Sequence, residues 1–292
     1  MDAYVYEYAV PVTFPGSPQT AFVALTEPEA LETWFAEHAE VEPRVGGAYN
    51  FWGKYSLGAA SKARATQMVT KYDPPTTLAF SWRLMDRDSE VTWTLRPEGE
   101  GTKVSVRHEF QSLPQGVRVK EMIDDLWRLH TGNLCFYLMG ERKIYRPDFD
   151  DPDPIVRHEI EIDASPAKVF AALVTPEHIK KWFPAPAPVV EPRVGGKYGF
   201  GMSYELDGKK VEPPPMTILE FEENRKLTIT WPDWRGDPTV PDQKVAWTLE
   251  DLGGRTRLTL VHSGFTRAVD VSDYPFGWVE FVGAIKKTAE EL

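Results

Sequence analysis

Apolar and polar residues alternate along several stretches of the second half of the chain. Leu227, Ile229 and Trp231 alternate with threonines, and the same period of two recurs over 245–249 and 258–262. A period of two with one apolar face is typical of an antiparallel sheet that is covered on one side. The pattern therefore predicts a run of strands with a single buried face.

Two short helices are predicted before these strands and one long helix after them. Ser165 is followed by a proline, which indicates a helix N-cap and first helical position, and a second helix is predicted from Pro176 to Trp182. The long helix is predicted over about 274–292, and in the first half of the chain over about 116–139. Each half thus consists of a strand, two short helices, about six strands and a long helix, which is the α+β class.

The two halves are copies of one unit. The segment Val41–Gly47 recurs letter for letter as Val190–Gly196. Residues 146–154, between the copies, include three prolines and four aspartates, which cannot continue a helix or a central strand. We therefore predict one domain over 1–146, a short linker over 147–154 and a second domain over 155–292.

Charge and composition narrow the classes of partner. The chain has 42% hydrophobic and 26% charged residues, close to the average of globular proteins. Its 33 Lys and Arg against 44 Asp and Glu give a net charge of −11. Nucleic acids and anionic membrane surfaces attract basic proteins, so neither is an expected partner.

Cysteine use and hydropathy bear on the compartment. Cys135 is the single cysteine, so an intramolecular disulfide is excluded and a cysteine-based zinc site is not expected. This usage fits a reducing cytoplasm. The first residues lack the pattern of a signal peptide, and no apolar run approaches the roughly 20 residues of a membrane-spanning helix. We expect a cytoplasmic protein with no membrane insertion.

Three features together resemble a known family. They are the order of elements, the Glu-Pro-Arg-Val-Gly-Gly turn of each copy, and the strand Thr256–Phe265. The chain resembles the START-like, or SRPBCC, superfamily, in the branch named after the activator of heat-shock protein 90 ATPase. The resemblance implies two tandem helix-grip domains, each a curved antiparallel sheet of six to seven strands wrapped on a long C-terminal helix. The chain has no counterpart of the N-terminal domain of the eukaryotic activator, so regulation of that chaperone is not expected.

Aromatic residues gather on the faces that are predicted to point inward. Each buried aromatic side chain removes about 150–250 Å² from water, so a few of them make a core or line a pocket. One interpretation is an apolar ligand cavity between sheet and long helix, and the other is ordinary core packing. The predicted ligand-binding residues are Trp52 (with Phe51 as the alternative at this position), Trp82, Trp93, His108, Trp127 and His130 in the first copy, and Phe200, Trp231, Trp247, His262, Trp278 and Phe281 in the second.

Two interpretations are open for the histidines. His108 and His262 occupy matching positions on the last strand, where a neutral imidazole offers one donor and one acceptor to a ligand. The alternative is a structural histidine that a backbone carbonyl or a helix-end group satisfies. His130 lies on the long helix three residues after Trp127, so His108 and His130 could act as an acid–base pair. The second copy has Phe281 in place of His130.

Motifs of the major enzyme classes are missing. The sequence contains no Gly-x-Ser-x-Gly, no phosphate-binding glycine loop, no dinucleotide-binding motif and no His-Glu-x-x-His. We expect no cofactor and no metal. The first hypothesis is non-enzymatic binding of a small hydrophobic or amphipathic ligand. The second is a cyclase or hydrolase type of enzyme that uses His108 and His130. The third is a co-chaperone-like module with a protein partner.

Overall fold

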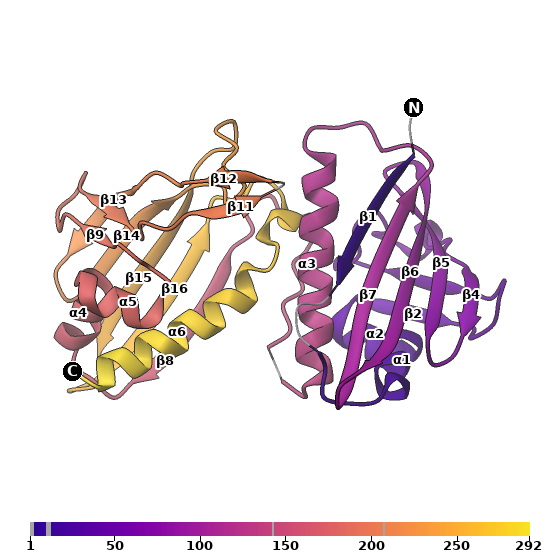
Figure 1. Ribbon diagram of the computed structural model, residues 1–292, viewed down its shortest axis with the longest axis horizontal. Helices are drawn as coiled ribbons and strands as arrows, with labels where there is room; N and C mark the ends of the chain where they lie inside the picture. The colour runs from indigo at the N-terminus through magenta and orange to yellow at the C-terminus, as the bar shows by residue number, and fades with distance from the viewer. Residues whose placement is uncertain (1–2, 10–12, 142, 207) are drawn as a thin grey trace. The chain divides into compact units, whose positions relative to one another are not determined.

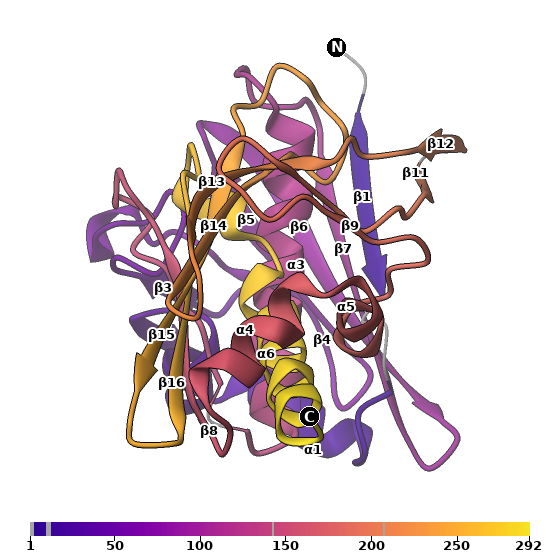
Figure 2. The ribbon, with the colours of Figure 1, turned by 90° about the vertical axis from the view of Figure 1, so that its left-hand side faces the viewer.

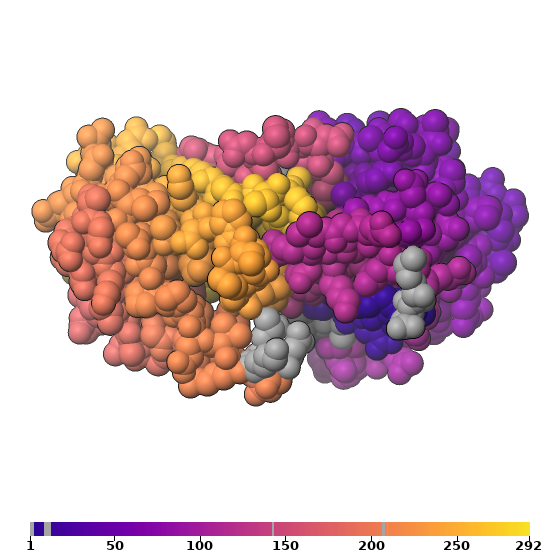
Figure 3. Space-filling model, turned by 90° about the horizontal axis from the view of Figure 1, so that it is seen from above, coloured from indigo at the N-terminus to yellow at the C-terminus, as the bar shows by residue number. Residues whose placement is uncertain are grey.

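The chain forms two compact units. The computed structural model describes residues 3–9, 13–141, 143–206 and 208–292. Unit 1 consists of residues 1–152 together with Arg267–Asp273, and unit 2 of residues 153–266 together with Tyr274–Leu292. In Figures 1 and 3, most of unit 1 is indigo to magenta and most of unit 2 is salmon to yellow.

Unit 1 contains two antiparallel sheets among its described residues. The five-stranded sheet has the order β1-β7-β6-β5-β4, and β2 pairs with β3 in a separate hairpin. The elements are β1 (Tyr4–Ala9), α1 (Pro18–Thr26), α2 (Pro28–Trp34), β2 (His38–Val41), β3 (Tyr49–Trp52), the 3-10 helix η1 (Lys62–Arg64), β4 (Val69–Asp73), β5 (Thr77–Leu84), β6 (Arg87–Glu98), β7 (Gly101–Phe110) and α3 (Val119–Leu138).

Unit 2 repeats this order of elements with a larger sheet. Its seven strands have the order β8-β16-β15-β14-β13-β10-β9, and a separate hairpin joins β11 and β12. Figure 2, which looks roughly along α6, shows the strands curving around this helix. The elements are β8 (Val156–Ile162), α4 (Pro166–Val174), α5 (Pro176–Trp182), β9 (Val189–Val190), β10 (Lys197–Gly199), β11 (Tyr204–Leu206), β12 (Lys209–Val211), β13 (Met216–Glu222), β14 (Lys226–Trp231), β15 (Gln243–Asp251), β16 (Thr256–Ser263), η2 (Ala268–Val271, grouped with unit 1) and α6 (Tyr274–Glu290).

The long closing helix of each copy covers one face of its sheet. In α6, Trp278, Val282 and Ile285 are buried, and they recur at helical spacing. In α3, Ile123 and Trp127 are buried in the same way. The α+β class, the tandem domains and the helix-grip arrangement are thereby confirmed, since the structure has antiparallel sheets and a long helix that closes each copy.

Paired hydrogen bonds fix the short helices in both copies. In unit 2 the Trp182 indole donates to the carbonyl of Ala172 at 2.8 Å, and the Tyr198 hydroxyl donates to the carbonyl of Leu173 at 2.8 Å. The equivalent bonds of unit 1 join Trp34 to Ala24 at 2.9 Å and Tyr49 to Leu25 at 2.7 Å. Both carbonyls lie at the end of the first short helix, where the last carbonyls lack helical partners. The repeated tryptophan is therefore an anchor between the two short helices.

The Glu-Pro-Arg-Val-Gly-Gly turns need both of their glycines. Gly195 has a φ of +76°, which L side chains rarely adopt. A Cβ on Gly196 would lie 2.1 Å from the carbonyl oxygen of Glu191. Arg193 pairs with Glu191 at 3.0 Å, and both side chains are exposed. The arginine of this turn thus makes a local ion pair.

The start of the predicted linker and the residue before it pack on unit 1. Arg146 donates to the carbonyl of Ala36 at 2.8 Å, and the Phe149 amide donates to the carbonyl of Lys54 at 2.8 Å. The Phe149 ring packs against the hydrophobic core of this unit. The division between the units falls after Pro152.

Candidate functional site

A buried histidine on the last strand of unit 2 is bound to the tryptophan of the closing helix. The Nδ1 atom of His262 accepts from the Trp278 indole at 3.0 Å. An indole nitrogen can only donate, so Nδ1 carries no proton and Nε2–H donates to Oε1 of Gln243 at 2.7 Å. Burial lowers the pKa of His262 to about 3. This imidazole is therefore neutral, and both of its nitrogens are engaged.

Unit 1 has the same arrangement with a different outer partner. His108 accepts at Nδ1 from the Trp127 indole at 3.1 Å, and its Nε2 lies 2.8 Å from Oγ of Ser89. The Ser89 hydroxyl donates in turn to the carbonyl of Trp82 at 2.7 Å. Burial lowers the pKa of His108 to about 3. The structural interpretation of both histidines fits this geometry, although their partners are side chains and not a backbone carbonyl or a helix end.

His130 lies in the aromatic interior of unit 1. Its ring is 4.4 Å from the ring of Phe35 and 6.2 Å from that of Trp127, measured between centroids. Burial lowers its pKa to about 3. Within the described residues, Nδ1 of His130 and Nε1 of Trp82 have no hydrogen-bond partner. Both nitrogens of His108, by contrast, have side-chain partners within the protein.

The other predicted residues of unit 1 pack against one another, with one correction. The ring of Trp127 lies 5.4 Å from that of Trp93 and 6.0 Å from that of Trp82, and all three side chains are buried. Trp52 does not face this interior: it is partly exposed, and its ring lies beside His38 at 5.3 Å. Its neighbour Phe51, 1% exposed, takes the inward position, because successive residues of a strand face opposite sides.

The predicted residues of unit 2 divide into two groups. Trp247 and Trp278 are buried with ring centroids 6.1 Å apart, and with His262 they form part of the packed interior. Phe200 and Trp231 instead line a pocket at one end of the unit. Phe281 does not line the pocket. Its ring lies 4.7 Å from the ring of Phe183, and Phe183 does line the pocket.

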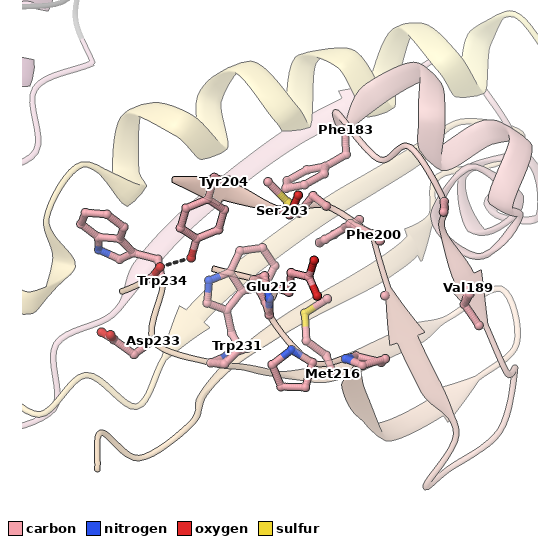
Figure 4. Close-up of a pocket in the computed structure, with 18 of the residues that line it drawn as sticks. Phe183, Val189, Phe200, Ser203, Tyr204, Glu212, Met216, Trp231, Asp233 and Trp234 are labelled. Carbon is pink, nitrogen blue, oxygen red and sulfur yellow. Dashed lines mark hydrogen bonds between the residues drawn. The ribbon is translucent and has the colours of Figure 1, made fainter. Parts of the chain in front are cut away.

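This pocket has a volume of about 650 Å³. Its wall is formed by the end of β14, by the segments before and after the β11–β12 hairpin, and by the first residue of α6. Figure 4 shows the side chains of Tyr204, Glu212 and Trp231 around it. Phe183 and Phe200 stack at 3.8 Å on one side of it. Its lining residues are Phe183, Ala187, Val189, Gly199–Tyr204, Glu212–Met216, Trp231–Trp234 and Tyr274.

The pocket opens where the two copies fold a segment of equal length differently. Phe51 and Val69 lie 18 positions apart in the chain, and so do Phe200 and Ile218. In unit 1 this segment folds back on itself, with the Gly53 amide bonded to the carbonyl of Ala59 at 2.9 Å. In unit 2 it forms the β11–β12 hairpin and the run Pro213–Pro215, which lacks the amide protons for such bonds. The hairpin leaves the aromatic wall open, whereas the matching residues of unit 1 are covered.

Two carboxylates are the only charged groups in the pocket wall, which consists entirely of described residues. Glu212 is exposed and pairs with Lys210, and this pairing holds the pKa of the Glu212 carboxyl below its usual range. Asp233 is 8% exposed and accepts the backbone N–H of Arg235 at 3.0 Å. The pocket is thus aromatic with an acidic rim.

The Tyr204 hydroxyl and the Trp231 indole each donate to another residue of the pocket wall. The Tyr204 hydroxyl donates to the carbonyl of Trp234, as Figure 4 shows. The Trp231 indole donates to the Tyr274 hydroxyl at 3.3 Å. Burial raises the pKa of Tyr204, which keeps this phenol protonated near neutral pH. These two bonds fix the rings and direct two donors of the wall toward the protein.

Sequence reasoning missed most of the pocket wall. Tyr204, Trp234 and Tyr274 lie in or next to loops, outside the alternating strand pattern. The available signal was the proline-rich and aromatic composition of 213–215 and 231–234, since such loops carry function more often than the strands do. Strand period alone places the aromatic residues in the interior and gives no information about loops.

None of the helices in the part of the chain that the structure describes combines the length and the apolar character that crossing a bilayer requires. Among the same residues, no three or more His, Cys, Asp or Glu side chains come together as metal ligands would.

Comparison with protein families gives a match to both copies. The family described as Activator of Hsp90 ATPase homolog 1-like protein matches residues 15–138 and 163–290. No curated protein matches the chain.

Similar solved structures include both single and double domains. An AHSA1-like protein from Rhizobium etli is 28% identical over 47% of this chain and 82% of its own, with a TM-score of 0.37. The Aha1 dimer from Colwellia psychrerythraea is 22% identical over 47% and 96%, with a TM-score of 0.37. DynU16, from the dynemicin biosynthetic locus, is 18% identical over 99% of both chains, with a TM-score of 0.39.

Proposed function

The chain belongs to the Activator of Hsp90 ATPase homolog 1-like family, and from this premise we propose that it binds a small amphipathic molecule in the pocket of unit 2. Binding, and not catalysis, is the proposed role. Unit 1 has no part in ligand contact in this proposal.

The pocket itself is the observation that carries the proposal. Its volume of about 650 Å³ lies within the range of about 300–1,000 Å³ that is usual for small-molecule sites. Aromatic side chains from β14, from the 199–204 loop and from the start of α6 converge on it. Apolar walls with a few fixed polar groups are typical of such sites.

The histidines favour binding over catalysis. An acid–base catalyst needs a ring nitrogen within hydrogen-bond reach of the substrate. Both nitrogens of His108 and of His262 are engaged by protein side chains, and burial lowers both pKa values to about 3. At neutral pH these groups would neither accept nor release protons during turnover.

Fluorescence titration with the neutral probe N-phenyl-1-naphthylamine tests the proposal. We expect saturable binding of one probe per chain. Ser203 lines the pocket and is exposed, so Ser203→Trp would fill the pocket without disturbing the core. Lys54→Trp, at the equivalent exposed position of unit 1, is the matched control.

The expected result is loss of probe binding in Ser203→Trp and full binding in Lys54→Trp. Equal binding by the wild type and Ser203→Trp would place the probe elsewhere and refute the proposal. Failure of the wild type to bind the probe would also count against it. Circular dichroism of both variants checks that the fold is intact.

A further inference from the structure

We propose that the ligand of this pocket is a cation: a molecule with an aromatic or similarly flat apolar body and a protonated amine or quaternary ammonium group. This inference rests on the proposed function and specifies the chemical class of the ligand. It is argued from the charges of the wall, the groups that its donors already bind, and the aromatic faces.

The sign of the wall charge is the first step. The pocket is lined by the carboxylates of Glu212 and Asp233 and, within its described lining, by no Lys, Arg or His. Figure 4 shows the Glu212 side chain among the aromatic residues of the wall. An anionic ligand would have to enter this field without a cation to receive it, which costs free energy in a partly desolvated site.

The cation that pairs with Glu212 does not reverse this sign. Lys210 pairs with Glu212, but both side chains are exposed, at 68% and 65%, and an exposed pair of this kind contributes little. A ligand ammonium group can therefore take the place of Lys210. Asp233 also lines the pocket, and its carboxylate accepts the backbone N–H of Arg235 at 3.0 Å.

The hydrogen-bonding groups of the wall favour a donor on the ligand. The Tyr204 hydroxyl is used by the carbonyl of Trp234, and the Trp231 indole is used by the Tyr274 hydroxyl. Among the residues of the wall that carry a hydroxyl group, Ser203 is the one that is exposed to solvent. A protonated amine supplies donors to a carboxylate rim, whereas a carboxylate or sulfonate ligand would need donors, and those of Tyr204 and Trp231 are already used.

The aromatic faces add a second attraction for a cation. Rings of Trp, Tyr and Phe attract cations through their negative faces, most strongly those of Trp. The protein itself shows this at the pocket, where the Arg235 guanidinium lies 4.2 Å from the ring centroid of Trp234. The net charge of −11 further raises the local concentration of cations around the chain.

A matched series of naphthalene probes tests this inference by calorimetry. The three probes are 1-naphthylmethylamine, 1-naphthylmethanol and 1-naphthylacetate, which share ring and methylene but are cationic, neutral and anionic at pH 7. We expect the cation to bind about tenfold or more tighter than the anion, the neutral probe to lie between them, and the difference to shrink in high salt.

Two variants test whether the Glu212 carboxylate causes the preference for the cationic probe. Glu212→Gln should reduce the ratio of the cation's affinity to the anion's affinity about three- to tenfold, because the change removes one negative charge close to the ligand. Glu205→Gln, an exposed carboxylate of β11 that does not line the pocket, is the control and should leave the ratio unchanged. Both residues are exposed, so neither change should affect folding.

The outcomes separate this inference from the proposed function. One outcome is that Ser203→Trp abolishes the binding of all three probes, but the anion binds as tightly as the cation. The pocket is then a binding site, and the cationic class of ligand is wrong. A preference for the cation that survives Glu212→Gln and high salt would equally overturn the electrostatic argument. If no probe binds, the proposed function fails and this inference fails with it.

Discussion

Acidification should destabilise unit 1 through its two buried histidines. His108 and His130 have pKa values lowered to about 3 by burial, against 6.5 in the unfolded chain. Between pH 6.5 and 3 the unfolded chain therefore binds more protons than the folded one. The stabilisation is complete above pH 6.5 and is lost as the pH falls toward 3.

The magnitude follows from the size of the shifts. Each histidine lowers the free energy of unfolding by about 1.4 kcal/mol per pH unit in this window. At pH 5, which is 1.5 units below 6.5, the loss is about 2 kcal/mol for one histidine and about 4 kcal/mol for two. Most carboxylates titrate below pH 5 and contribute little between pH 5 and 7.5. His130→Phe, which installs the residue of the second copy, should halve the slope.

The single cysteine provides an assay for this unit. Cys135 lies on α3 and is partly buried, so its labelling by 4,4′-dithiodipyridine rises when unit 1 unfolds. Pulse labelling across a urea gradient at pH 5.0, 5.5, 6.0, 6.5 and 7.5 gives the free energy of unfolding of unit 1 at each pH. His38→Gln, a change at an exposed histidine, controls for the substitution itself.

Two results would refute this reasoning. One is a free energy of unfolding that stays constant from pH 7.5 to 5. The other is a pH slope in His130→Phe equal to that of the wild type, which would mean that His130 does not titrate on unfolding. If His38→Gln also halved the pH slope of the free energy of unfolding, titration of surface groups would explain the slope instead.

Two further predictions concern the stability of unit 2. Trp278→Phe leaves Nδ1 of the buried His262 without a donor, and should cost about 2–4 kcal/mol in urea denaturation, while His262→Leu in the same chain should recover part of this loss. A smaller cost of under about 0.5 kcal/mol would show that the bond contributes nothing. Gly196→Ala places a Cβ 2.1 Å from the carbonyl oxygen of Glu191 and should lower stability by about 1–3 kcal/mol or more. Val194→Ala, at a 62% exposed position of the same turn, should change stability by less than about 0.5 kcal/mol, and equal effects of the two changes would contradict the steric explanation.

The sequence predicted the architecture because burial patterns are local. The alternation at Leu258, Leu260 and His262 and the helical stripe of Trp278 and Ile285 each follow from a single element that has one buried face. The internal repeat then doubled the evidence for each element. Caps and turns added boundaries, such as the predicted start at Pro166 and end at Trp182.

The roles of the inward residues needed contacts between distant elements. Whether His262 faces a ligand or a protein partner depends on Trp278 and Gln243, which lie 16 and 19 residues away in the chain. The strand period alone could not distinguish Phe51 from Trp52 until the start of the strand was fixed.

The pocket was decided by tertiary structure. The segments that follow Phe51 and Phe200 have equal length and begin from matching strands, yet one covers its aromatic wall and the other leaves it open. The sequence by itself determined the repeated unit, its α+β layers and its aromatic inward faces, because these depend on period and composition. Only the fold decided which copy has the pocket, because that depends on how loops without any period pack against residues far away in the chain.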